Sequence, residues 1–61
     1  MLTAAFHRGE AERFRSLAET TNEALIREKL TRIADLHAKI ADRLQEAARI
    51  LAALDKAPAL I

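Results

Sequence analysis

The second half of the chain carries apolar residues at alternating spacings of four and three. The pattern continues without a slip for about four heptads, as in a helix that packs along its side against another helix. Its positions are Ile26, Leu30, Ile33, His37, Ile40, Leu44, Ala47, Leu51 and Leu54. We therefore expect a long helix over about residues 23–55, followed by a tail at 56–61 in which Pro58 prevents the helix from continuing.

The first part of the chain predicts a shorter helix over about residues 3–19. It is separated from the long helix by the segment Thr20-Thr21-Asn22-Glu23, in which poor helix formers precede a good capping residue. The segment is typical of a turn over about residues 20–22 with a capping box, in which Thr20 is the cap and Glu23 reaches back. Thr21 or Asn22 could be the cap instead. Because no Gly or Pro enforces the turn, one unbroken helix is the alternative.

Two ladders of alanine at seven-residue intervals connect the two predicted helices. They are Ala4, Ala11 and Ala18 in the first and Ala34, Ala41 and Ala48 in the second. An antiparallel pairing about the turn sets Ala11 opposite Ala34 and Ala4 opposite Ala41, where small side chains let two backbones approach closely. The sequence thus predicts an all-α protein, with one domain over residues 1–61 folded as an antiparallel two-helix hairpin.

Composition and charge narrow the choice of protein class. The 61 residues include no Val, Tyr, Trp or Cys, which argues against strands, disulfides and cysteine-bound zinc. A chain this short usually needs a partner to complete its core. We find no apolar stretch with the length of a signal peptide or a membrane span, and we expect a cytoplasmic protein.

The predicted hairpin leaves several apolar side chains uncovered, and its long helix outruns the short one by about 20 Å. We expect a second copy to cover them, giving a homodimer that closes a four-helix bundle. The expected interface residues are Phe6, Leu17, Leu36, Ala47, Ile50, Leu51 and Leu54. The alternatives are a higher homo-oligomer, or a different protein bound to the C-terminal part of the long helix.

Two histidines offer the chain's main candidate for metal chemistry. The alanine register brings His37 opposite His7, and Glu10 lies one turn from His7, so these three side chains form a hypothetical metal site. The Glu-x-x-His spacing of carboxylate-bundle metalloproteins is absent, because residues 4 and 34 are Ala. The alternatives are a histidine at the edge of a bundle layer or a pH-sensitive pair. We expect no cofactor.

Catalytic and nucleic-acid-binding patterns are weak. The chain has one serine, Ser16, and no Gly-rich or nucleophile motif, so we do not expect an enzyme. Its one glycine, Gly9, is expected to lie where another helix packs closely. Arg8 and Arg15 share a stripe that would face RNA in a Rop-like regulator, yet acidic residues alternate with them and the net charge is only +1. We expect neither nucleic-acid nor membrane binding.

Two short patterns resemble those of a family of short α-proteobacterial proteins that has no assigned activity. The first, R-x-x-A-E-x-x-x-x-L-A, begins at Arg8, and the second, R-x-x-L-x-x-L-A, is matched by Arg27-Glu28-Lys29-Leu30 and Ile33-Ala34. The resemblance spans about residues 7–43 and implies a helical hairpin, whose architecture is similar to Rop. Those proteins commonly have Asp-Pro where this chain has Glu23-Ala24, and often Tyr in place of His7 and His37.

Overall fold

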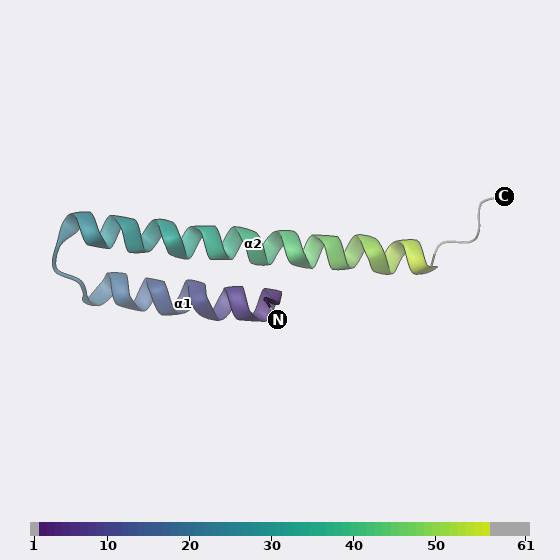
Figure 1. Ribbon diagram of the computed structural model, residues 1–61, viewed down its shortest axis with the longest axis horizontal. Helices are drawn as coiled ribbons and strands as arrows, with labels where there is room; N and C mark the ends of the chain where they lie inside the picture. Colours follow the sequence, from purple (N-terminus) through teal and green to yellow (C-terminus); the bar gives the residue numbers. More distant parts are fainter. Residues whose placement is uncertain (1, 57–61) are drawn as a thin grey trace.

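Two helices and a short connection account for the part of the chain that the structure describes, residues 2–56 of a computed structural model. Helix α1 spans Ala4–Thr20 and helix α2 spans Ala24–Lys56. They lie side by side and antiparallel (Figure 1). The all-α hairpin is confirmed, and the alternative of one unbroken helix is wrong. Each helix begins and ends one residue later than the expected range; residues 57–61 of the expected tail lie outside the described residues.

Side-chain hydrogen bonds fix the beginning of α1 and the turn. The Thr3 hydroxyl accepts a hydrogen bond from the Phe6 amide at 3.1 Å, capping α1. At the other end, the hydroxyls of Thr20 and Thr21 both donate to the Leu17 carbonyl. The guanidinium of Arg27 donates across the turn to the carbonyls of Thr21 and Asn22. The expected capping box is therefore wrong, because Thr20 is the last residue of α1 and its hydroxyl bonds within that helix.

Alanines form the contact between the helices. Ala34 and Ala41 are 0% exposed, and Ala11 and Ala18 are also buried. His7 is the one larger buried side chain among the described residues, and it lies beside this alanine contact. The two alanine ladders therefore lie where close approach of the backbones requires them.

Two ion pairs report the register of the hairpin. Arg8 pairs with Asp42 at 3.1 Å, and Arg15 pairs with Asp35 at 3.2 Å. The partners are seven residues apart on both helices and run in opposite directions, as in an antiparallel heptad repeat. Ala41 is the last buried residue of α2, so the close contact between the helices ends near Ala41 and Asp42.

The rest of α2 extends beyond α1 (Figure 1). Every residue from 42 to 56, called the overhang below, is exposed. The chain measures 60 × 16 × 14 Å and has a radius of gyration of 16.6 Å. A compact domain of 61 residues would have a radius of about 10.5 Å, so one hairpin does not form a compact core.

Candidate interaction surface

The repeat of four and three along α2 forms an exposed strip, called the apolar seam below. It runs from Ile26 to Leu54 through Leu30, Ile33, His37, Ile40, Leu44, Ala47 and Leu51. Six large members are between 36% and 65% exposed: Ile26, Ile33, Ile40, Leu44, Leu51 and Leu54. The alanines of α2 that contact α1 are Ala34 and Ala41, and each follows a seam residue by one position. Helix α1 therefore packs on the edge of the seam and does not cover it.

The apolar side chains of α1 lie on the same face of the hairpin as the seam. The rings of Phe14 and His37 stack, with centroids 5.8 Å apart and planes 8° apart. Phe6 and Leu17 follow the same side of α1 and are both more than 40% exposed. The hairpin therefore presents one broad apolar face built from both helices.

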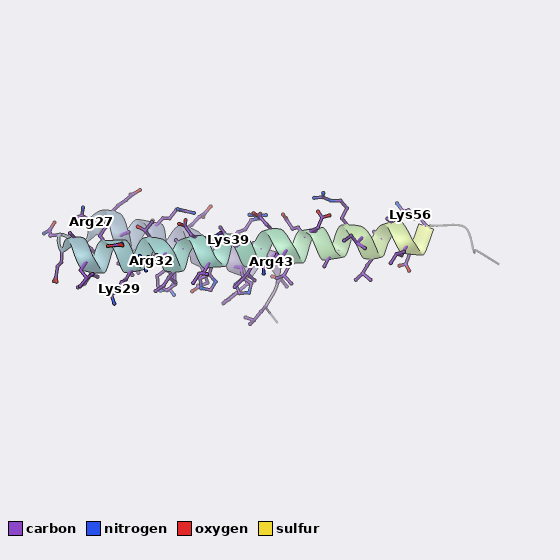
Figure 2. All side chains as sticks on the ribbon, turned by 90° about the horizontal axis from the view of Figure 1, so that it is seen from above. Arg27, Lys29, Arg32, Lys39, Arg43 and Lys56 are labelled. Atoms are coloured by element: carbon purple, nitrogen blue, oxygen red, sulfur yellow. The ribbon has the colours of Figure 1, made fainter. Side chains whose placement is uncertain are left out.

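The opposite face is charged. It carries the ion pairs of Arg8 and Arg15, and Arg8 also donates to Gln45. The outer surface of α2, turned away from α1, carries Arg32, Lys39 and Arg43 (Figure 2). The contrast between the two faces is the expected form of an amphipathic element that packs against another chain on one side.

The structure brings His7 and His37 together at the edge of the apolar face. Their Nδ1 atoms are 2.8 Å apart, and the rings are stacked with centroids 5.0 Å apart. One Nδ1 must donate and the other accept, so a pair protonated on both rings would lose this hydrogen bond. His7 is 6% exposed, and its ring makes a T-shaped contact with the ring of Phe6, with centroids 5.2 Å apart.

Glu10, the third member of the hypothetical metal site, is held by another residue. Arg13 donates to both carboxylate oxygens at 3.2 and 2.6 Å, and this hydrogen bonding lowers the pKa of Glu10 and raises the pKa of Arg13. The same guanidinium lies 4.6 Å above the Phe14 ring. Within residues 2–56 no group of three His, Asp or Glu side chains has an arrangement suited to a metal ion.

The remaining candidate residues fall into two groups. Arg8 and Arg15, considered for nucleic acid, each face a carboxylate of α2. Four interface candidates lie in the exposed overhang: Ala47, Ile50, Leu51 and Leu54. Leu36 and Ile50 flank the seam on the side away from α1, where a second helix on the seam would contact them.

The expected interface omitted four exposed seam residues, Ile26, Ile33, Ile40 and Leu44. The alanine ladder that contacts α1 marks a different strip of α2. The offset of one residue between the alanine ladder and the apolar seam can be read from the sequence. It indicates that the seam is the strip of α2 that α1 leaves uncovered.

Gly9 also lies differently from expectation. A Cβ atom added there would have nothing within 4 Å beyond its own local backbone, so α2 does not pack closely against it.

Comparisons with family models, curated proteins and solved structures find no significant match. A separate search of the two helices for a membrane span finds no segment of sufficient length and apolarity in the described part of the chain.

Proposed function

We propose that this chain is a small, non-catalytic interaction and scaffold protein that acts as a homo-oligomer. A second copy covers the apolar face of the hairpin, and the two hairpins close a four-helix bundle. The observation that carries the proposal is the composition of the core: four alanines and His7 are buried, whereas twelve large hydrophobic side chains are exposed. Exposed apolar surface of this extent on a monomer marks an interaction site.

The exposed area supports the same proposal. The accessible surface of the chain is 5155 Å², whereas a compact monomer of 6.8 kDa would expose about 4,000 Å². The excess of roughly 1,200 Å² exceeds the area of about 800 Å² that each partner contributes to a standard stable interface. The exposed surface is therefore large enough to form a stable interface with a second copy.

Light scattering on the wild type and on two variants tests the proposal. Leu51→Asp places a charge on the apolar seam of the overhang, and Ala53→Asp places the same charge two residues away on the charged side. We expect the wild type and Ala53→Asp to have twice the chain mass of 6.8 kDa, and Leu51→Asp to be monomeric. A wild type that is monomeric and fully helical at every concentration would overturn the proposal.

A further inference from the structure

The point at which α1 begins divides α2 into two nearly equal parts. The covered part spans residues 24–41, and the overhang spans residues 42–56. With 17 residues, α1 is almost as long as the overhang. Apart from the contacts of Arg8 with Asp42 and Gln45, the overhang has no neighbour in its own hairpin. Helix α1 has a matching length, and its apolar side faces outward.

The apolar seam runs through both parts of α2 without a change in spacing. A partner that covers it must therefore be a straight helix about 40 Å long, the rise from Ile26 to Leu54 at 1.5 Å per residue. Only α2 itself has that length in this chain, since α1 would span about 25 Å. The occupant that fits the seam is α2 of a second copy.

The unpartnered segments favour an antiparallel pair, because that direction can lay each overhang beside α1 of the partner. In an antiparallel pair, the a positions of one helix face the d positions of the other. In the register proposed here, eight of the nine seam positions form eight layers. Each pairing occurs twice, because the two copies are related by a twofold axis. The layers are Ile26 with Leu51, Leu30 with Ala47, Ile33 with Leu44, and His37 with Ile40.

Neighbouring registers leave more of the seam, or part of α1, without a partner. A shift by one heptad toward the N-terminus leaves Ala47, Leu51 and Leu54 without layers. The opposite shift also forms eight layers, with Ile26 bare in place of Leu54, but it carries the Thr20 end of α1 past Lys56. The register given above instead places all of α1 beside about residues 36–52 of the partner's α2. The exposed Leu17 of α1 then faces this segment.

We propose that two copies pair α2 against α2 in antiparallel orientation, with the twofold axis midway between Ala38 and Lys39. Each overhang then lies on the partner's α1 and completes its apolar face. Four helices meet at the centre, beside Phe6 and His7 of both copies, and three meet toward each end. This arrangement rests on the proposed function, because it specifies how the second copy is placed.

Two single-cysteine variants, Ala24→Cys and Ala53→Cys, test the register. Both positions are exposed, the native chain has no cysteine, and each lies 14.5 residues from the proposed axis. Spin labels on either variant should be separated by about 44 Å between the two copies, at 1.5 Å per residue. Equal distances at the two positions are the signature of this axis. Light scattering and circular dichroism on the labelled samples show that each variant remains assembled and helical.

Other arrangements give different pairs of distances. If two hairpins overlap fully, with the axis beside Ile33, position 24 gives about 27 Å and position 53 about 60 Å. A parallel pair gives about 10 Å at both. Either result in a dimer overturns the staggered register while the proposed self-association stands. A monomer in the absence of label overturns the proposed function itself.

Discussion

The covered part of α2 and the overhang carry the same sequence pattern in different surroundings. Ala34, Ala41 and Ala48 share one strip of the helix, yet the first two are fully buried against α1 and Ala48 is exposed. The apolar seam likewise continues from Ile40 into Leu44 and Leu51 after α1 has ended. Helix α1 therefore accounts for only part of the periodicity of α2, and the rest fits a neighbour from another chain.

Charge on the seam of the overhang should have the largest effect. Ala47→Asp would bury a carboxylate against the partner's α2, at a cost of order 3 kcal/mol in the free energy of unfolding. Ala53→Asp makes the same change on the exposed side of the overhang and should cost less than about 1 kcal/mol. Urea unfolding followed by circular dichroism at one protein concentration measures both. Equal losses would show that the two sides of the overhang are equivalent.

Larger side chains on the alanine strip should have different effects on stability in the covered part of α2 and in the overhang. Ala41→Leu forces a large side chain between the closely packed helices and should lower the free energy of unfolding by about 1–3 kcal/mol. Ala48→Leu is the matched change in the overhang, where no helix of the same hairpin packs on it, and should lower the free energy of unfolding by less than Ala41→Leu does. The same urea experiment applies. A larger loss from Ala48→Leu would mean that this strip is already tightly packed in the assembly.

The buried histidine contact gives a third test, within the covered part. His37→Phe leaves the buried Nδ1 of His7 without its partner and should cost about 1–3 kcal/mol. Changing His7 to Phe as well removes the unpaired group and should restore most of the loss, because an apolar pair of similar shape replaces a polar one. Thermal unfolding of the single and double variants measures this. A double variant less stable than both singles would contradict the hydrogen-bonded pairing.

Gly9 offers a stabilising change. Because nothing lies close to the position of an added Cβ, Gly9→Ala should raise the free energy of unfolding by about 0.5–1 kcal/mol through helix propensity. The mass of the assembly should stay the same. Destabilisation by this substitution would show that another chain packs closely on Gly9.

The Glu10–Arg13 pair should give the smallest effect, visible only in its pH dependence. Folding lowers the pKa of Glu10 through the hydrogen bonds from Arg13. The pair therefore stabilises the fold fully above the ordinary pKa of a glutamate, about 4.3, and loses its contribution as the pH falls through the folded pKa. Wild type should therefore exceed Glu10→Gln in stability at pH 7 and match it in strong acid. Denaturant titrations at both pH values measure the difference. A difference that persists in acid would have another origin.

Local physics explains why the fold was predictable from the sequence. The threonine-rich break, the absence of strand-forming runs and the two alanine ladders each report a nearest-neighbour or heptad relationship. They gave two antiparallel helices with bounds within one residue of those observed. The approach of His7 to His37 follows from the same ladder register.

Other features were not predictable from the sequence, because the side chains involved have more than one possible hydrogen-bond partner. Thr20 can cap a following helix or bond back to its own, and the structure uses the second option. Glu10 can serve as a metal ligand or pair with Arg13, and the spacing of three favours the ion pair. The guanidinium of Arg27 reaches carbonyls of the turn, a contact that needs the turn geometry before it can be foreseen.

If a second copy completes the core of the hairpin, folding and self-association should be one event. A dilution series measured by light scattering and circular dichroism on the same samples makes that comparison. We predict that helicity falls in step with the loss of mass, because a separated hairpin lacks a core of its own. A chain that reaches the monomer mass of 6.8 kDa with its helicity unchanged would contradict the account.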